Sequence, residues 1–210
     1  MRLILSVLLL SGVLAHATLS DDLTTAQKKQ LASGQSVQVV KTIPGAIWPK
    51  VTIYNVVDAT PQQVYNLFTD YASAPSYTPN MISAKVIATP DANTKDVRYT
   101  VKFPVLSKVS YTVRNFYSQK GGSYEVKWQL LESPLAKEST GSLRVDPYED
   151  GQSLLRYSNH VVPSTRLAAG LKGQALSEAQ KTVNAITAEA NKRAQTHVAV
   201  KTPAAPAAAN

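Results

Sequence analysis

Few residues of this chain have the types and spacing that acid–base or metal chemistry needs. His160 is the only histidine in the predicted folded region, because His16 lies in an apolar N-terminal segment and His197 in the C-terminal tail. One histidine cannot build a histidine-based metal site, and no cysteine is present to supply thiolates. Gly-rich phosphate loops, His-Glu-x-x-His and Gly-x-Ser-x-Gly do not occur in the sequence. We therefore expect His160 to be a surface or packing residue.

Asp70 is the second candidate for chemistry, because it lies at the predicted end of a helix. A carboxylate in this position could act as a general base. Carboxylates at helix ends more often accept backbone hydrogen bonds, so we expect a capping role for Asp70. A Ser-His-Asp arrangement drawn from distant residues stays open, although no motif marks one.

The residues better suited to binding are aromatic and lie on predicted strands. Two β-branched segments, 37–43 and 51–57, are followed by six strand-like runs separated by turn signals, at 84–88, 97–105, 110–118, 124–131, 139–147 and 153–162. Consecutive strands with short turns predict an antiparallel meander. Apolar and polar residues alternate along 124–131. One face of the sheet should therefore be buried and the other should face water.

Helices are predicted before and after these strands. A short helix is expected at 23–34, and Thr60, Pro61 and Gln63 mark the start of another. A long helix is expected at 166–193, and its apolar stripe is rich in small residues such as Ala175 and Ala179. Facing strands that carry large aromatic residues could close over such a stripe as a filled core or leave room for a ligand. The spacing alone does not decide between the two.

The order of these elements resembles the helix-grip fold. The segment VDATPQQVYNLFTDY at 57–71 resembles the characteristic start of START-like proteins, and YTPNM at 77–81 resembles the proline-centred turn that follows it. The resemblance extends over roughly residues 37–195. It is greatest to the coenzyme Q-binding and polyketide cyclase branch of the START-like (SRPBCC) superfamily, in the exported form found in bacteria.

The resemblance implies an α+β, Bet v 1/START-like fold, with a seven-stranded antiparallel sheet wrapped on the C-terminal helix and an apolar cavity between them. Members bind sterols, lipids, quinones, polyketides or hormones. Their catalytic residues are not shared, so none is assigned here, and fold alone does not define function. We predict that the cavity is lined by Tyr99, Val101, Phe103, Tyr111, Val113, Trp128, Tyr157, Asn159, Leu171 and Ala175.

The N-terminus has the pattern of a secretory signal peptide. Arg2 precedes an apolar stretch at 3–14, and Ala15-His16-Ala17 is the small-x-small pattern that precedes a cleavage site. The alternative is an uncleaved anchor, but the stretch is shorter than the roughly 20 residues that span a bilayer. We expect export, to the periplasm or alternatively to the medium. The predicted divisions are a signal peptide at 1–17, an N-terminal helical extension at 18–36, a START-like domain at 37–195 and a disordered Ala/Pro-rich tail at 196–210.

Charge limits the choice of partners. The net charge is +8, but no run of three basic residues occurs. We expect a solvated basic surface and no nucleic-acid partner, with transient contact to anionic lipid as the alternative. The prediction is an exported protein that binds a lipid, sterol, quinone or polyketide-like molecule without a cofactor or metal. The alternatives are a cyclase or hydrolase that uses the same cavity, and a filled-core domain that acts through its surface.

Overall fold

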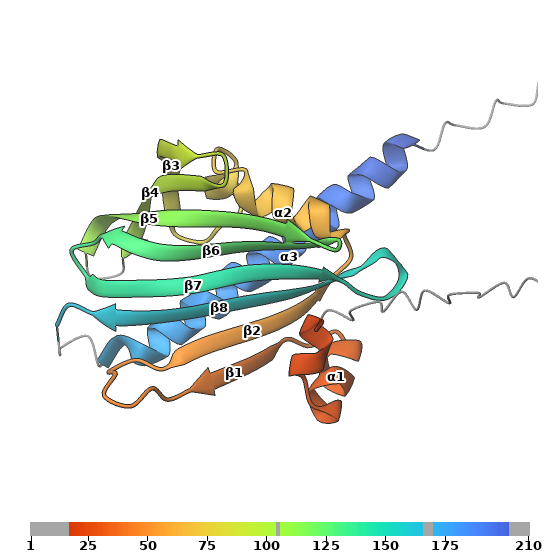
Figure 1. Cartoon of the computed structure of the whole chain (residues 1–210), viewed down its shortest axis with the longest axis horizontal. Coiled ribbons are helices and arrows are strands. Elements are labelled where there is room, and N and C mark those ends of the chain that lie inside the picture. Colours follow the sequence, from red (N-terminus) through yellow and green to blue (C-terminus); the bar gives the residue numbers. More distant parts are fainter. Residues whose placement is uncertain (1–16, 104–105, 166–169, 202–210) are drawn as a thin grey trace, which may run out of the picture.

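The computed structural model of the chain describes residues 17–103, 106–165 and 170–201. Eight strands form an antiparallel sheet in the order β1-β2-β8-β7-β6-β5-β4-β3, and the long helix α3 lies across one face of it (Figure 1). The strands are β1 Val37–Lys41, β2 Lys50–Val57, β3 Met81–Asp91, β4 Thr94–Phe103, β5 Leu106–Lys120, β6 Ser123–Glu132, β7 Ala136–Pro147 and β8 Ser153–Pro163. The helices are η1 Leu19–Asp22, α1 Thr25–Ala32, α2 Pro61–Thr69, η2 Ala74–Ser76, η3 Glu149–Gly151 and α3 Lys172–Lys201.

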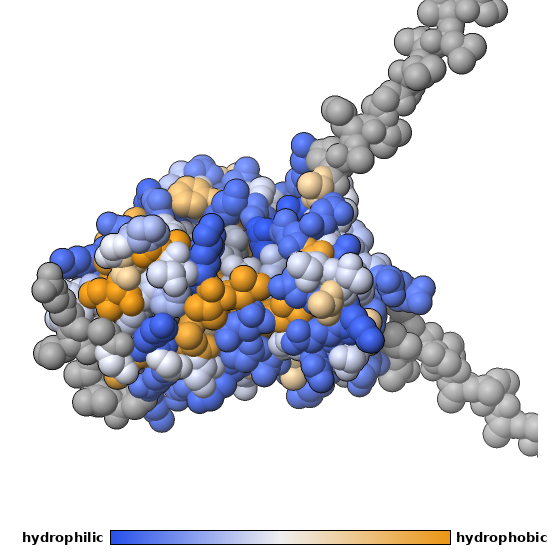
Figure 2. Space-filling view, turned by 90° about the horizontal axis from the view of Figure 1, so that it is seen from below, coloured by the Kyte–Doolittle hydropathy of each residue, from blue (hydrophilic) through white to orange (hydrophobic). Residues whose placement is uncertain are grey.

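The α+β helix-grip architecture is confirmed, but the expected number of seven strands is wrong by one. The additional strand is β1, which the residue pattern predicted at 37–43 but the resemblance does not include; it ends at Lys41 and pairs with β2 from Val37 opposite Tyr54 to Lys41 opposite Lys50. β1 forms one edge of the sheet and leaves Val39 and Val40 exposed. Figure 2 looks at the molecule from this side and shows apolar side chains gathered over the middle and left of the face.

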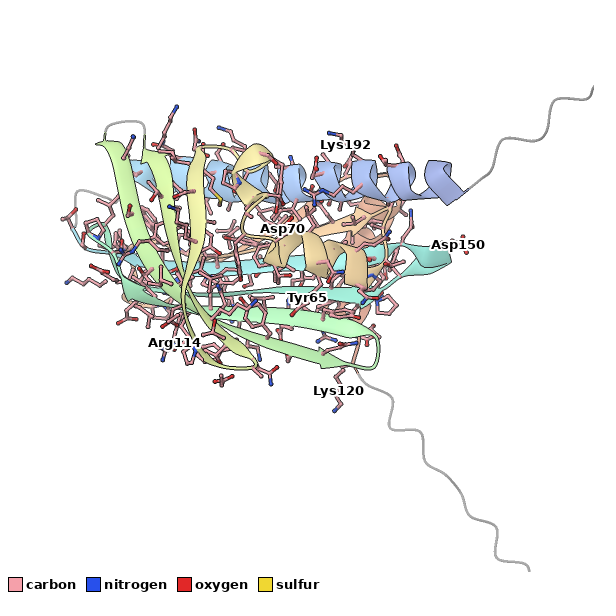
Figure 3. The ribbon with its side chains drawn as sticks, turned by 90° about the horizontal axis from the view of Figure 1, so that it is seen from above. Tyr65, Asp70, Arg114, Lys120, Asp150 and Lys192 are labelled. Atoms are coloured by element: carbon pink, nitrogen blue, oxygen red, sulfur yellow. The ribbon has the colours of Figure 1, made fainter. Side chains whose placement is uncertain are left out.

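The start of α2 agrees with the prediction. The Thr60 amide donates to Gln63 Oε1 at 2.8 Å, and the Gln63 amide donates to Thr60 Oγ1 at 3.3 Å. This reciprocal capping box satisfies two amides that the helix itself leaves free, and Pro61 occupies the first turn where no amide is needed. α2 therefore begins at a fixed place and carries Tyr65 and Asp70 beside the sheet and α3 (Figure 3).

α3 is the element that fills the core. Val183, Ile186 and Ala190 are almost fully buried against β2, β7, β8 and α2. The helix runs on to Lys201, beyond the expected end at residue 193, so residues 196–201 are helical where a disordered tail was expected. The reason is that 194–201 contains no glycine or proline, and the first proline is at 203. Residues 202–210 of the predicted tail lie outside the described residues.

The N-terminal extension packs on the opposite face of the sheet from α3. Leu19, Leu23 and Leu31 are buried there with Val37 and Tyr54. They form a second apolar cluster in which η1 and α1 cover the outer face of β2 and β8. The predicted leader at 1–16 lies outside the described residues.

A hydrogen-bonded ion pair on β7 holds the beginning of this extension. The Arg144 guanidinium donates to both oxygens of Asp146 at 2.8 and 2.9 Å, and also to the Ala17 carbonyl at 3.0 Å. Asp146 in turn accepts the Leu19 amide at 2.8 Å and is almost fully buried. Such two-point contacts between guanidinium and carboxylate fix geometry as well as charge. The chain is therefore fastened to the sheet from Ala17 onward.

This docking predicts that Leu19→Ala destabilises the protein. Leu19 has no exposed surface, and removing a buried leucine side chain costs about 2–5 kcal/mol. The matched control is Leu131→Ala, because Leu131 is 45% exposed and surface changes cost about 0.5 kcal/mol or less. Urea midpoints of the two variants measure the difference. Equal midpoints would show that the extension does not contribute to the fold.

Candidate ligand-binding cavity

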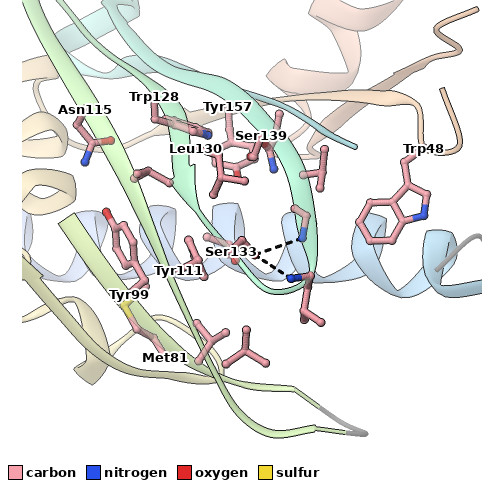
Figure 4. Close-up of a pocket in the computed structure, with 18 of the residues that line it drawn as sticks. Trp48, Met81, Tyr99, Tyr111, Asn115, Trp128, Leu130, Ser133, Ser139 and Tyr157 are labelled. Carbon is pink, nitrogen blue, oxygen red and sulfur yellow. Dashed lines mark hydrogen bonds between the residues drawn. The ribbon is translucent and has the colours of Figure 1, made fainter. Parts of the chain in front are cut away.

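A cavity of about 310 Å³ lies between the inner face of the sheet and α3 (Figure 4). This volume is at the lower end of the range of about 300–1,000 Å³ that is typical of small-molecule sites. Asn115 is buried at the deep end, beneath β4, β5 and β6, whereas Trp48 and Ser133 at the other end are partly exposed. We therefore take the mouth to lie between the β6–β7 turn and the β1–β2 loop. The lining residues are Trp48, Phe68, Met81, Tyr99, Val101, Val109, Tyr111, Val113, Asn115, Trp128, Leu130, Ser133, Leu135, Ala136, Ser139, Tyr157, Asn159, Val161 and Thr182.

The strand residues of the predicted site are brought together here. Those that line the cavity are Tyr99, Val101, Tyr111, Val113, Trp128, Tyr157 and Asn159. Strand alternation was enough to find them, because every second residue of an antiparallel strand faces the same side. The side chain of Phe103 lies outside the described part of the chain. Whether these residues contact a ligand stays a prediction.

The helix residues of the predicted site are placed elsewhere. Ala175 lines a smaller neighbouring cavity of about 40 Å³, and Leu171 is not among the residues that line either cavity. α3 begins only at Lys172, and its phase turns Leu176 and Ala179 toward the core. Thr182 is the residue of α3 that lines the main cavity. The small-residue stripe therefore borders the cavity but does not form its centre.

Residues from outside the predicted strand faces complete the cavity. Trp48 reaches it from the β1–β2 loop, Phe68 from α2, and Ser133 from the β6–β7 turn. Loop residues carry no periodicity that would reveal which way they point. Asn115 is different, since it lies on the same face of β5 as Tyr111 and Val113. Its place in the strand alternation was the signal that could have identified it.

Stacked aromatic rings form the walls. Tyr99 and Tyr111 lie opposite each other on β4 and β5, with ring centroids 5.4 Å apart and planes 23° from parallel. Trp128 and Tyr157 have centroids 5.4 Å apart, and Phe68 lies 6.4 Å from Trp128. Aromatic pairs at these spacings attract beyond their burial. The rings therefore hold one another in place and keep the cavity open.

Gly141 allows Trp128 to lie flat against β7. The two residues are direct partners in the β6–β7 ladder. A Cβ added to Gly141 would overlap the Trp128 ring and the carbonyl oxygen of Ser158. A glycine inside a strand often marks such a close approach. Gly141 is thus the residue that sets the position of the indole in the cavity wall.

The lining carries no formal charge in the described part of the chain. It contains no Asp, Glu, Lys, Arg or His, and its titratable groups are tyrosines. Burial raises the pKa of Tyr111 to about 12 and also raises the pKa values of Tyr99 and Tyr157. These phenols therefore stay protonated at neutral pH. The cavity presents neutral hydroxyl and amide groups on apolar walls.

Neutral polar groups gather at the two ends of the cavity. At the deep end, the Asn115 amide donates to the Tyr71 hydroxyl at 3.2 Å, and Tyr71 is paired with the Tyr117 hydroxyl. At the mouth, the Ser139 hydroxyl donates to Asn159 Oδ1 at 3.4 Å. A ligand with a polar group at either end would find a hydrogen-bond partner there.

The two candidates for acid–base chemistry have structural roles or lie away from the cavity. Asp70 caps α2, accepts from the Ser73 amide at 3.3 Å and lies 3.6 Å from Arg193. The Ser73 side chain is the main reason that the pKa of Asp70 is lowered, and the Ser73 amide adds to the effect. His160 lies between Asn159 and Val161 on β8, and both neighbours line the cavity. By strand alternation, His160 faces the outer side of the sheet.

Within residues 17–103, 106–165 and 170–201, no group of three or more His, Asp or Glu side chains is arranged to hold a metal ion. Among the helices of these same segments, none combines the length and the apolar character that crossing a bilayer requires.

Comparison with known proteins places the chain beside lipid-transfer and cyclase proteins. The family described as polyketide cyclase/dehydrase and lipid transport matches residues 49–199. A search of curated proteins found no match. Among solved structures, the chain is similar to a STAR-related lipid transfer protein from Xanthomonas axonopodis (fragment 25–204), with a TM-score of 0.66 and 12% identity over 74% of this chain and 93% of that chain.

Two other solved structures have the same fold. Human STARD10 has a TM-score of 0.59 and 12% identity, over 90% of this chain and 87% of that chain. The Zhui aromatase/cyclase from a Streptomyces species has a TM-score of 0.55 and 17% identity, over 69% of this chain and 94% of that chain. At these identities the likeness establishes the START-like fold.

The geometry of Gly141 predicts that Gly141→Ala reshapes the cavity wall. The new methyl group would displace the Trp128 ring and press on the strand β8 backbone, so we expect a loss of about 1–3 kcal/mol of stability, as for other overpacked cores. Gly173→Ala is the control, since a Cβ there meets nothing within 4 Å. Denaturant midpoints and tryptophan emission measure both effects. An unchanged midpoint and emission in Gly141→Ala would contradict the close approach.

Proposed function

Because the chain belongs to the polyketide cyclase/dehydrase and lipid transport family and has a START-like fold, we propose that it binds an uncharged, apolar small molecule in the cavity between the sheet and α3. The single observation that carries this proposal is a cavity of about 310 Å³ with aromatic walls and no charged lining residue. Lipids, sterols, quinones and polyketide-like molecules are the candidate ligands.

The binding mechanism is removal of apolar surface from water. Burial contributes about 25 cal/mol per Å², so about 200 Å² of ligand surface would contribute about 5 kcal/mol before the entropic costs of binding. The aromatic walls are held by one another, so little ordering is needed when the ligand enters. Asn115 at the deep end and Asn159 at the mouth supply the polar contacts that would orient it.

The lining also determines what the cavity rejects. A carboxylate or phosphate placed inside would lose its water and find no cation, and burial of an unpaired charge is strongly unfavourable. A charged headgroup would therefore remain at the mouth. The neutral hydroxyl and amide groups inside suit a ligand that carries carbonyl or hydroxyl oxygens.

Binding fits the lining better than the alternative of a cyclase or hydrolase. General acid–base catalysis works best with a group whose pKa lies near the operating pH. The titratable residues of the described lining are tyrosines, and burial moves the pKa of Tyr111 upward to about 12, away from neutrality. A ligand that is recovered chemically unchanged would support binding, and a steady conversion of it would support the enzyme.

The first test of the proposed function uses the matched pair Ser139→Phe and Thr140→Phe. Ser139 lines the cavity, whereas its neighbour Thr140 is exposed. The ring at residue 139 should fill the mouth and weaken binding of the fluorescent apolar probe N-phenyl-1-naphthylamine at least tenfold, and the ring at residue 140 should change it little. Denaturant midpoints confirm that both variants fold. A parent that does not bind the probe and yields no ligand on native mass spectrometry would overturn the proposal.

We propose as well that the protein works outside the cytosol, in the periplasm. The support is the leader pattern ending at Ala17, together with the buried hydrogen bond from the Leu19 amide to Asp146, which would hold the chain to the sheet just after such a cut. A segment cut at this point would leave Thr18 beside Asp21, whose carboxylate accepts the Thr18 amide at 2.7 Å. The new ammonium group would strengthen that contact, because the donor would then be charged.

This part of the proposal predicts that the exported protein begins at Thr18. Intact-mass analysis of protein recovered from the cell envelope measures the N-terminus directly. Cleavage removes the Ala17 carbonyl, but Asp146 still accepts the Leu19 amide, so the extension should stay docked. A mature protein that retains the apolar stretch at 3–14 would contradict cleavage and indicate a membrane tether.

A further inference from the structure

Exposed lysines gather at one end of the sheet, where the cavity opens. The mouth end is framed by the β1–β2 loop, the end of β4, the start of β5, the β6–β7 turn and the start of α3. Six exposed lysines lie there: Lys41, Lys50, Lys102, Lys108, Lys137 and Lys172. The acidic residues at the same end are Glu132 and Glu138, and Glu132 lies 3.7 Å from Arg98. The mouth end is therefore strongly basic.

The opposite end is mixed in charge. The turns and strand ends there carry Asp58, Asp91, Glu149 and Asp150 beside Lys95 and Lys120, and Lys192 lies on the part of α3 that reaches this end. Figure 3 shows Asp150 at the right-hand tip of the molecule, near the described end of α3, and Lys120 at the lower edge. A clear excess of one sign of charge is therefore found at the mouth end, where basic residues outnumber acidic ones.

The lysines surround the cavity mouth closely. Lys102, Lys108 and Lys137 each directly neighbour a residue that lines the main cavity, and Lys172 lines the smaller cavity beside it. None of the six forms an ion pair with any residue that the structure describes. Lys41 and Lys50 stand directly opposite each other across β1 and β2, where like charges repel. The six lysines therefore do not stabilise the sheet through ion pairs.

Apolar side chains stand among these lysines. Ile47 is 37% exposed and Leu131 is 45% exposed. Ile47 precedes Trp48 and Leu131 follows Leu130, and both of these neighbours line the cavity. Val40, on the edge strand that leads to the same loop, is 45% exposed. Tryptophan between lysines and aliphatic side chains is the composition found where proteins meet the headgroup region of a bilayer.

We propose that the mouth end is a docking face for an anionic lipid surface, which places the cavity opening against the membrane from which an apolar ligand would enter or to which it would leave. The lysines would lie at the headgroups, and Ile47, Trp48 and Leu131 would reach the acyl boundary. Each lysine near an anionic surface strengthens binding about fivefold. Membrane docking is a property separate from ligand binding. It rests on the proposed function only in that a docked cavity would exchange an apolar ligand with the membrane.

A vesicle experiment tests the docking face with two matched triple variants. Lys50→Gln, Lys108→Gln and Lys137→Gln remove three charges from the mouth, and Lys28→Gln, Lys120→Gln and Lys192→Gln remove three exposed charges from elsewhere. On vesicles of phosphatidylglycerol and phosphatidylcholine, the mouth variant should bind about 100-fold more weakly than the parent. The control variant should bind nearly as well as the parent. Pure phosphatidylcholine and 0.5 M salt should abolish binding, because salt screens charge.

The depth of docking can be read from Trp48. The sequence contains two tryptophans, so Trp128→Phe leaves Trp48 as the sole reporter. Its emission should shift to the blue on anionic vesicles, and brominated lipids should quench it. Absence of vesicle binding by the parent, or an equal loss in both triple variants, would overturn the proposal. A mouth-dependent affinity for single-stranded DNA without affinity for vesicles would do the same and indicate a nucleic-acid surface.

Probe binding separates this inference from the proposed function. The mouth variant should still bind N-phenyl-1-naphthylamine like the parent, since the mutated lysines are not among the residues that line the main cavity. Vesicle binding lost with probe binding intact would support the docking face as a distinct surface. A parent that binds vesicles but no apolar probe would leave the docking face standing and overturn the ligand proposal.

Discussion

The structure is governed by the fact that one helix cannot cover a sheet of eight strands. Strands about 4.8 Å apart make a sheet about 34 Å wide, whereas a helix with its side chains is about 10–12 Å across. α3 fills the space over β2, β7 and β8, where Val183 and Ile186 complete the main core. α3 does not cover the inner face of β4, β5 and β6 in the same way. That inner face is closed by sheet curvature, by α2 and by large aromatic side chains that leave a cavity between them.

The aromatic walls make that cavity stable without a ligand. Tyr99 and Tyr111 stack across adjacent strands, and Trp128 is held between Phe68 and Tyr157. Aromatic rings are wide and have few rotatable bonds. A small number of them can therefore border a cavity, whereas flexible aliphatic side chains would move into it. Gly141 contributes by the absence of a side chain, because the indole occupies the place of its Cβ. The shape of the site thus depends on one glycine in a middle strand.

The parts that the sequence predicted are those in which local pattern determines position. Strand alternation identified the cavity face from Tyr99 to Asn159, and the capping box at Thr60 located α2. The face of α3 was harder to predict, because the stripe through Ala175 and Ala179 can continue through Thr182 or Val183. In the structure Thr182 lines the cavity and Val183 is buried in the core. Trp48 was not predictable, since a loop residue reaches the mouth only once β1 has paired with β2.

The edge strand β1 links the two faces of the molecule. Its first residue, Val37, is buried with Leu19 and Leu31 beneath the N-terminal extension, and the loop after its last residue, Lys41, carries Trp48 to the cavity. The family match begins at residue 49, so β1 and Trp48 lie just outside the residues that the family model matches. The apolar cluster of the extension stabilises β1 at the edge of the sheet, and β1 in turn positions the loop at the mouth. A feature that belongs to the outer face of the sheet therefore helps to shape the entrance on the inner face.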